Sequence, residues 1–260
     1  MTVVPKKGLG QHFLVDENLL GVIGRLAELE PSDVVLEVGP GLGVLTRYLA
    51  ERVALVHAVE LDRALEPHLA DTLAACNNIE LVFGDALKLD FVSLRPPPRK
   101  LVANLPYNIA TPLIVESLVG SNALELWCVM VQREVADRLF AAPSTKAYGA
   151  VSVVVQLTAR RAGFHPVSRT VFRPSPNVDS ALVAFRRIDA PKSLADVRRV
   201  VEGAFSHRRK TLANALQLAG VADRSRSVNA LAAIGRLADI RAEALDPAEF
   251  VALTDSLAVS

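Results

Sequence analysis

The sequence predicts an α/β fold in which a parallel, doubly wound sheet is followed by a smaller all-helical domain. Short β-branched runs alternate with helical patterns up to about residue 189, which is typical of parallel strands joined by crossover helices. After Pro191 only helical patterns remain, with no strand between them. We therefore expect a sheet domain over residues 1–189 and a helical domain over residues 190–260.

Local patterns predict the individual elements. The expected strands cover residues 34–38, 54–60, 79–83, 100–104, 125–131 and 180–186. The expected helices cover residues 16–29, 44–52, 62–75, 112–119 and 133–140, and then 193–206, 208–218, 226–235 and 247–258. Asp16 is a candidate N-cap, and Asp246 is another that precedes a proline at the first helical position. The apolar run 150–157 fits a helix or a strand, and the prolines of 172–179 predict an extended chain.

The composition is that of a globular protein, with 51% hydrophobic and 22% charged residues. No apolar run approaches the roughly 20 residues needed to span a bilayer. Residues 1–7 lack the apolar stretch that a secretory signal places after its charges. The only cysteines, Cys76 and Cys128, indicate neither a disulfide framework nor a metal site. We expect a cytoplasmic protein that binds no metal and no membrane.

The positive charge is concentrated in one block of the chain. Residues 1–150 hold 13 Lys and Arg against 18 Asp and Glu, whereas residues 151–226 hold 14 against 5, a net charge of +9. Residues 227–260 hold 2 against 5. Because the whole chain carries only +1, this block favours a localised surface for a polyanion. The alternative is a solvated helical face without a partner.

A glycine turn, Gly39-Pro40-Gly41-Leu42-Gly43, follows the first expected strand. Glycines let the chain turn sharply and approach a ligand, and the free N–H groups of the next helix favour an electronegative partner. The dinucleotide fingerprint G-x-G-x-x-G/A is not met, because Val44 or Thr46 stands where its last small residue is needed. The chain also lacks a P-loop motif, so a pyrophosphate or triphosphate ligand is not predicted.

Polar residues end three successive strands of the predicted sheet: Glu60, Asp85 and Asn104. In open α/β sheets the ligand crevice lies outside the carboxyl ends of the strands. Glu60 stands 21 residues beyond Gly39, where a carboxylate can accept from both ribose hydroxyls. Asp85 can accept from an adenine amino group. Each acid alone could be a surface residue, but the three together favour a nucleoside-like cofactor without phosphate.

The segment Asn104-Leu105-Pro106-Tyr107 lies at the same predicted edge, because Pro106 stops the strand. The side-chain oxygen of Asn104 and the carbonyl of Leu105 are two acceptors, and Tyr107 is a stacking ring. Two acceptors and a ring suit a flat base with an exocyclic amino group. The alternative is a strand-ending turn with a packed tyrosine.

Six motifs occur in one order along nearly the whole chain. They are Gly8–Leu14, Glu37–Gly43, Gly84–Ala86, Asn104–Ile109, Phe172–Ser180 and Phe205–Leu212. Together they resemble the S-adenosylmethionine-dependent ribosomal RNA adenine N6-dimethyltransferases, and most closely the bacterial branch that acts on two adjacent adenines near the 3′ end of small-subunit (16S) RNA. His12 departs from this pattern, because many members have Asn there, and Arg173-Pro174-Ser175-Pro176 replaces a more proline-rich run.

The resemblance implies a Rossmann-like methyltransferase sheet whose N-terminal segment, residues 1–15, covers S-adenosylmethionine. The implied cofactor contacts are His12, Leu14, Gly39, Gly41, Glu60, Leu61, Asp85, Ala86 and Asn104. The implied catalytic positions are Asn104, Leu105, Pro106 and Tyr107, with Phe172 as a second stacking wall for the target adenine.

The resemblance also gives the basic block a partner, the 16S RNA of the immature small ribosomal subunit. The candidate phosphate contacts are Arg160, Arg161, Arg186, Arg187, Arg208, Arg209 and Lys210. The alternative for residues 208–210 is a charge cluster at a helix start. We expect the enzyme to act as a monomer in ribosome biogenesis.

Other functions are compatible with parts of the sequence. A methyltransferase of the same fold could act on large-subunit (23S) RNA, although residues 104–109 and 205–212 favour the small-subunit type. An RNA-binding assembly factor without activity could keep the fold, but Glu60, Asp85, Asn104 and Tyr107 are all intact. A dehydrogenase is disfavoured by Val44 and Thr46.

Overall fold

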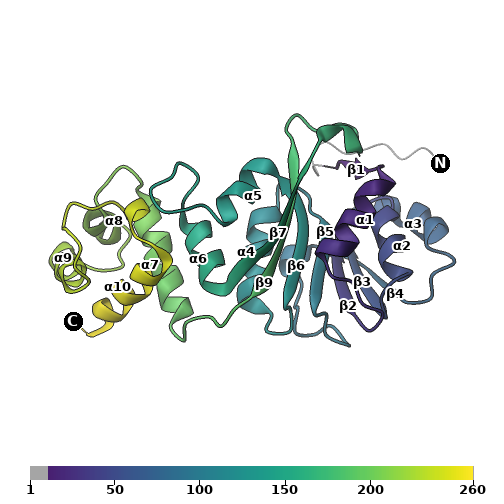
Figure 1. Cartoon of the computed structure of the whole chain (residues 1–260). Helices are drawn as coiled ribbons and strands as arrows, with labels where there is room; N and C mark the ends of the chain where they lie inside the picture. The colour runs from purple at the N-terminus through teal and green to yellow at the C-terminus, as the bar shows by residue number, and fades with distance from the viewer. Residues whose placement is uncertain (1–10, 260) are drawn as a thin grey trace. The chain divides into compact units, whose positions relative to one another are not determined.

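The structure is a computed structural model that describes residues 11–259 (Figure 1). Its contacts divide the chain into two units. The sheet unit holds the described residues up to Ala136 together with Arg160–Arg187, and the helical unit holds Asp137–Ala159 together with the residues from Ile188 onward. Residues 137–159 thus group with the C-terminal helices. The first ten residues of the predicted covering segment lie outside the described part.

The sheet unit is built on seven strands in the order β4-β3-β2-β5-β6-β9-β7. Their bounds are β2 Val34–Val38, β3 Leu55–Glu60, β4 Ile79–Phe83, β5 Lys100–Asn104, β6 Leu126–Gln132, β7 Ala159–Val167 and β9 Ser180–Arg187. The five strands from β4 to β6 are parallel, and β9 runs antiparallel to β6. A mixed α/β sheet of this kind confirms the predicted fold class.

Register brings the carboxyl ends of the parallel strands to one edge. Val38 pairs with Val59, and Glu60 pairs with Phe83. On the other side of β2, Asn104 of β5 pairs with Met130 of β6. Because all these strands run the same way, the turns that follow β2, β3, β4 and β5 open at a shared edge, where α/β folds bind ligands.

Helices cover both faces of this sheet. They are α1 Glu17–Leu26, α2 Val44–Ala50, α3 Glu66–Thr72, α4 Ala110–Gly120 and α5 Arg133–Leu139. Asp16 caps α1 as predicted, accepting from the Asn18 N–H at 2.8 Å. The apolar stripe of α1 and the buried leucines of α2 share one core with residues of β2, β3, β5 and β6. The indole N–H of Trp127 in β6 donates to the hydroxyl of Ser117 in α4 at 2.9 Å. This bond holds α4 against the sheet.

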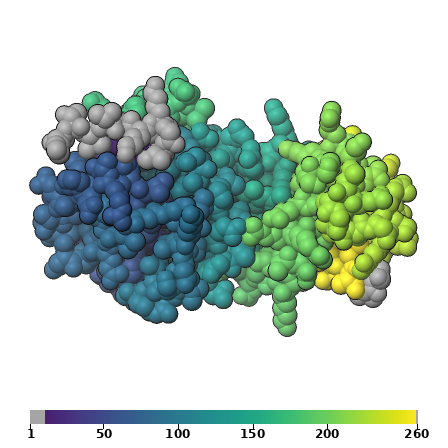
Figure 2. Space-filling model, turned by 180° about the vertical axis from the view of Figure 1, so that it is seen from behind, coloured from purple at the N-terminus to yellow at the C-terminus, as the bar shows by residue number. Residues whose placement is uncertain are grey.

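A short ribbon, β1 (Phe13–Leu14) with β8 (Phe172–Arg173), joins the N-terminal segment to the chain that connects β7 with β9. Residues 11–259 also contain the 3₁₀ turns η2 Arg63–Leu65, η3 Ala86–Lys88, η4 Arg169–Val171 and η5 Ala242–Ala244. Figure 2 shows the reverse side of the molecule, where segments coloured blue form much of the surface of the sheet unit. In the linker between β4 and β5, Val92 is 62% exposed.

The helical unit consists of α6 Ala150–Thr158, α7 Leu194–Ser206, α8 Leu212–Leu218, α9 Arg224–Ala233 and α10 Pro247–Val259. At the start of α10, Asp246 accepts from the Glu249 N–H at 2.9 Å, and Glu249 accepts from the Asp246 N–H at 2.9 Å. This reciprocal cap confirms the predicted start at Asp246-Pro247. The hydroxyl of the fully buried Tyr148 donates to the Leu245 carbonyl at 2.8 Å and ties the unit together.

Three parts of the structure differ from or complete the local predictions. The apolar run 150–157 is helical, as α6. Strand β7 was not predicted, because its exposed arginines, glycine and proline leave no alternation of apolar and polar residues in its sequence. Helix α8 begins at Leu212 rather than residue 208, so Arg208–Lys210 precede it. Within residues 11–259, no helix is both long and apolar enough to cross a membrane.

Candidate active site

A cavity opens at the carboxyl edge of β2, β3 and β5 in the sheet unit. Its walls come from the N-terminal segment and from four strand-to-helix turns. The lining residues are Gln11, His12, Phe13, Leu14, Glu37, Val38, Gly39, Pro40, Gly41, Leu42, Val44, Leu45, Val59, Glu60, Leu61, Gly84, Asp85, Ala86, Asn104, Leu105, Pro106, Tyr107, Asn108 and Ile109. Every predicted cofactor contact is among them.

The glycine turn brings the backbone close to two other walls of the cavity. Gly39 has a φ of +75°, and a Cβ on it would lie 3.2 Å from the ring of Pro106. Gly41 has a φ of +58°, and its Cβ would meet the Phe13 ring at 3.0 Å. Side chains at these positions would strain the backbone and push away the neighbouring walls. The turn is therefore packed directly against the segment that carries Asn104.

The carboxylate of Glu60 is held by backbone donors at the end of β3. Its Oε2 accepts from the Gly41 N–H at 3.1 Å, and its Oε1 accepts from the Asp62 N–H at 2.9 Å. Each oxygen can accept a further bond, so a diol in the cavity could donate to both. Asp85 begins η3 and accepts from the Leu87 N–H at 3.0 Å, beside the buried Ala86. Both acids are fixed before any ligand arrives.

The amide of Asn104 has a defined orientation. Its Nδ2 donates to the His12 carbonyl at 3.1 Å, which leaves Oδ1 as the acceptor. The next peptide continues the sheet ladder, because the Leu105 N–H donates to the Met130 carbonyl at 3.1 Å. No described backbone group donates to the Leu105 carbonyl. Two acceptors from consecutive residues therefore border the cavity.

The ring of Tyr107 is anchored at both ends. Its hydroxyl lies 2.6 Å from the Oγ of Ser180, the first residue of β9. Burial raises the pKa of Tyr107 more than the Ser180 hydrogen bond lowers it, so the hydroxyl is protonated at neutral pH. The His12 ring lies 5.4 Å from the Tyr107 ring at 31°. His12 Nδ1 carries a hydrogen, because it lies 2.7 Å from the Pro174 carbonyl oxygen, which can only accept.

The cavity is acidic. Glu37, Glu60 and Asp85 line it, and none of the described residues that line it is Lys or Arg. The side chain of Glu37 is 1% exposed, and its Oε2 has no hydrogen-bond partner within the described part of the chain. Such a lining repels phosphate and suits a ligand that carries positive charge and N–H donors. Burial, opposed by the Thr46 hydroxyl and reinforced by the Glu60 charge, raises the pKa of Glu37 to about 8.

This raised pKa predicts a pH-dependent stability. Glu37 keeps its proton in the folded state up to about pH 8 but loses it near pH 4.5 when unfolded, so folding becomes less favourable as pH rises between these values. The cost approaches about 1.4 kcal/mol per pH unit. Between pH 6 and pH 8 the wild type should lose about 2 kcal/mol of unfolding free energy relative to Glu37→Gln in urea titrations. Parallel pH profiles for the two proteins would contradict a buried, protonated Glu37.

Comparison with protein families adds an independent line of evidence. The family model described as ribosomal RNA adenine dimethylase matches residues 5–257. The chain belongs to this family. It is 48% identical over 250 residues to the ribosomal RNA small subunit methyltransferase A of Rubrobacter xylanophilus, covering 96% of this chain and 94% of that protein. The protein of the same name from Moorella thermoacetica is 43% identical over 269 residues, covering 98% and 93%.

Solved structures share this fold over nearly the whole chain. A dimethyladenosine transferase from Plasmodium falciparum matches with a TM-score of 0.77 and 25% identity, covering 93% of this chain and 96% of that one. The 23S rRNA methyltransferase ErmE matches with a TM-score of 0.68 and 29% identity, covering 95% and 99%. The small-subunit relatives are more similar in sequence than this large-subunit enzyme.

One predicted catalytic residue of the dimethylase lies away from the cavity. Asn104, Leu105, Pro106 and Tyr107 all line it, but Phe172 does not. Phe172 is 2% exposed and belongs to the core beneath β1 and α1. Its pairing with Leu14 explains this place, because residue 172 of β8 turns inward and residue 173 turns outward. Phe172 thus supports the N-terminal wall from below, and its role as a stacking surface for the base stays a prediction.

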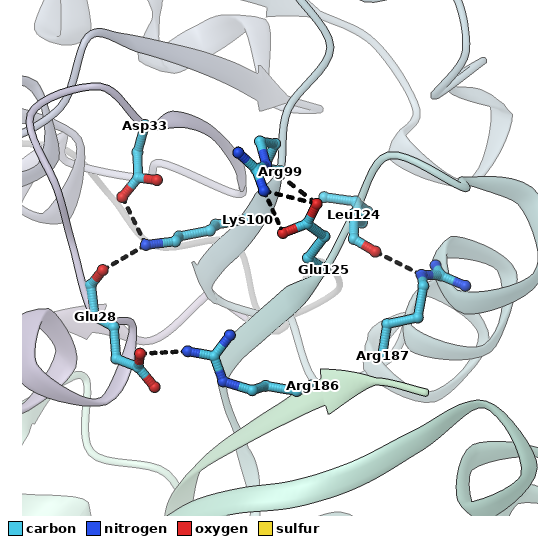
Figure 3. A network of polar contacts seen from close by, with 8 residues as sticks. All are labelled: Glu28, Asp33, Arg99, Lys100, Leu124, Glu125, Arg186 and Arg187. Atoms are coloured by element: carbon cyan, nitrogen blue, oxygen red, sulfur yellow. Dashed lines mark hydrogen bonds and ion pairs between the residues drawn. The ribbon is translucent and has the colours of Figure 1, made fainter. Parts of the chain in front are cut away.

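The four predicted arginines of the sheet unit lie at the edge opposite the cavity. Arg186 pairs with Leu126 at the start of β6, and the Ile188 N–H donates to the Thr158 carbonyl, which brings Arg160 and Arg161 to the same edge. Figure 3 shows Arg186 against Glu28, and Arg187 donating to the Leu124 carbonyl at 2.6 Å. Arg187 also donates to the Leu118 and Ser121 carbonyls, at the end of α4. These contacts give Arg186 and Arg187 roles within the fold.

The helical unit presents the other predicted cations, which are all exposed in the turn between α7 and α8. Arg208 donates to the Tyr148 carbonyl at 3.2 Å and lies 3.9 Å from the Glu243 carboxylate. Arg209 and Lys210 form no ion pair with any residue that the structure describes.

Two further site residues were not predicted, Ser180 as the anchor of Tyr107 and Glu37 as a buried acid in the cavity wall. Glu37 could have been singled out from the sequence, because it is the one charged residue in the otherwise apolar strand β2.

Proposed function

We propose that this chain transfers methyl groups from S-adenosylmethionine to N6 of two adjacent adenines in a 3′-terminal hairpin of 16S rRNA, in the immature small ribosomal subunit. The observation that carries the proposal is the pair of acceptors, Asn104 Oδ1 and the Leu105 carbonyl, beside the anchored ring of Tyr107. The family match and the names of the relatives support adenine as the base and the small subunit as the site.

The cavity fits S-adenosylmethionine by charge and by donor chemistry. The Glu60 oxygens suit the ribose hydroxyls, and Asp85 suits the adenine amino group. The unpartnered Oε2 of Glu37 suits a polar group of the cofactor. The absence of Lys and Arg among the described lining residues agrees with a cofactor that has no phosphate. When bound, the cofactor supplies an electrophilic methyl group on a sulfonium.

The residues of the Asn104 segment prepare the adenine nitrogen for attack. The N6 lone pair is delocalised into the ring, so the amine is a poor nucleophile. Acceptance of its two hydrogens by Asn104 Oδ1 and the Leu105 carbonyl orients the lone pair and stabilises the positive charge that develops on nitrogen. The His12 carbonyl keeps the amide from turning over. Alignment in this cavity supplies much of the remaining acceleration.

No dedicated general base is needed, because the methylated nitrogen becomes strongly acidic and gives up its proton readily. The target base must leave its stack to enter the cavity. Tyr107 offsets part of that cost, since stacking on an aromatic side chain contributes about 1–3 kcal/mol per base. The Ser180 hydrogen bond holds the Tyr107 ring in place for this contact.

Arg209 and Lys210 are the phosphate contacts that we propose for the helical unit, because they are exposed and have no ion pair with a described residue. Each neutralised phosphate adds about −0.7 to −0.9 to the slope of log affinity against log salt. RNA binding should therefore weaken steeply with salt. The enzyme would act as a cytoplasmic monomer during ribosome biogenesis.

Labelled-methyl transfer tests this function. Immature small subunits should accept methyl groups from S-adenosylmethionine, and mapping should find dimethylated adenines at two adjacent positions of the 3′-terminal hairpin. Purified large subunits serve as the control and should stay unlabelled. Labelling of the large subunit alone, or cofactor binding without transfer to either particle, would refute the proposal.

A further inference from the structure

The candidate phosphate contacts of the sheet unit lie far from the cavity. Ser180 of β9 pairs with Gln132 at the cavity edge, whereas Arg186 pairs with Leu126 at the other end. Six residues separate the two positions, which at about 3.3 Å per residue places Arg186 about 20 Å from the Tyr107 anchor. Figure 3 shows this distant edge, where Arg186 and Lys100 already contact Glu28. RNA at the target base therefore needs other cations.

The connection between β7 and β9 carries two such cations along the cavity edge. Arg169 begins η4, and Arg173 ends β8; both side chains are exposed. Neither guanidinium has an ion pair with a residue in the described range 11–259. The nearby Asp179 accepts from the backbone N–H of Arg169 at 3.4 Å. The connection between β7 and β9 thus carries two exposed arginines that have no ion pair within the described residues.

This connection is bound to the walls of the cavity at three points. Arg173 pairs with Phe13, whose ring lines the cavity. The neighbouring Pro174 carbonyl accepts from His12 at 2.7 Å. At its end, Ser180 holds the hydroxyl of Tyr107 at 2.6 Å. The Ser175 hydroxyl donates to the Arg169 carbonyl at 2.9 Å and closes the loop on itself. The two arginines are therefore held at the rim beside the proposed base site.

Charge separates the rim from the interior. The carboxylates of Glu60 and Asp85 line the cavity, so an RNA phosphate is repelled from it while a neutral base can enter. A backbone that follows the extruded base must remain outside, where guanidinium groups bind phosphates well. We propose that Arg169 and Arg173 hold the phosphates that flank the extruded adenine. This inference rests on the proposed methylation of RNA adenine.

A pair of double variants tests the inference. Arg169→Gln with Arg173→Gln removes the rim charges, and Arg25→Gln with Arg52→Gln removes two exposed charges that lie beside Glu28 at the opposite edge. We expect the rim variant to raise KM for small subunits at least 10-fold and to reduce the salt slope of RNA binding by about 1.4–1.8 in total. Its dissociation constant for S-adenosylmethionine, measured by calorimetry, should stay within about twofold of wild type. The opposite-edge variant should keep KM within about threefold.

The outcomes separate this inference from the proposed function. If the wild type methylates small subunits but the rim variant matches it, or if the opposite-edge variant loses as much as the rim variant, the rim assignment is overturned. If the wild type binds S-adenosylmethionine but modifies no RNA, the proposed function itself fails. Unchanged cofactor affinity and unchanged thermal unfolding of the rim variant show that its loss comes from RNA contact rather than from misfolding.

Discussion

Asn104→Ala should lower kcat for methyl transfer by about 10³-fold, the upper range seen when one preorganised hydrogen-bonding group is removed from a reacting centre. The physical reason is the loss of Oδ1, one of two acceptors that orient the adenine amine. The cofactor contacts of Glu60 and Asp85 remain, so the dissociation constant for S-adenosylmethionine should change by less than about threefold. Single-turnover methylation of small subunits and calorimetry measure the two quantities separately.

The matched control is Asn122→Ala, which removes an exposed amide between α4 and β6. It should leave both kcat and cofactor binding unchanged. Substantial turnover by Asn104→Ala would contradict the proposal that this amide accepts a hydrogen bond from the adenine amine. An equal loss of cofactor binding and turnover would show instead that the residue serves the cofactor alone.

Glu60→Gln should weaken S-adenosylmethionine binding by roughly 10- to 100-fold, because charged hydrogen bonds contribute about 1.5–3 kcal/mol each. In the wild type, both backbone N–H groups, of Gly41 and Asp62, donate to carboxylate oxygens of Glu60. The glutamine side chain has only one oxygen, so its N–H₂ group would face one of these two donors. Calorimetry at fixed pH measures the effect. Thermal unfolding checks that the glycine turn survives the change.

The control for this substitution is Glu66→Gln, an exposed acid in the first turn of α3 with the same change in charge. It should bind the cofactor as the wild type does. An unchanged affinity in Glu60→Gln would mean that the ribose contacts some other group, and the assignment of the cavity to a nucleoside would lose its main polar anchor.

The parallel strands were predictable from sequence because each is a short run dominated by apolar residues and bounded by turn residues. β2, β4 and β5 have the bounds that the pattern predicted. Strand β7 was missed because it is an edge strand with Arg160, Arg161, Gly163 and Pro166, and an edge strand buries too little to impose alternation. The run 150–157 could not be assigned, since a buried helix and a buried strand share one apolar pattern.

The cofactor half of the site was predictable for a topological reason. Parallel register brings the ends of successive strands to one edge, so Glu60, Asp85 and Asn104 had to gather there. The positions of Phe172 and Arg186 depend on the direction of β9 and on the pairing of β8 with β1. Those long-range pairings leave no local signal, so charge counts alone could not distinguish the cavity edge from the opposite one.

The most direct test of the central claim is a structure of the enzyme with small-subunit RNA and a non-reactive analogue of S-adenosylmethionine. The account predicts an extruded adenine whose N6 lies about 2.7–3.2 Å from both Asn104 Oδ1 and the Leu105 carbonyl oxygen. A base bound with its amino group away from these two oxygens, or an Asn104 amide turned so that Nδ2 faces the base, would contradict it.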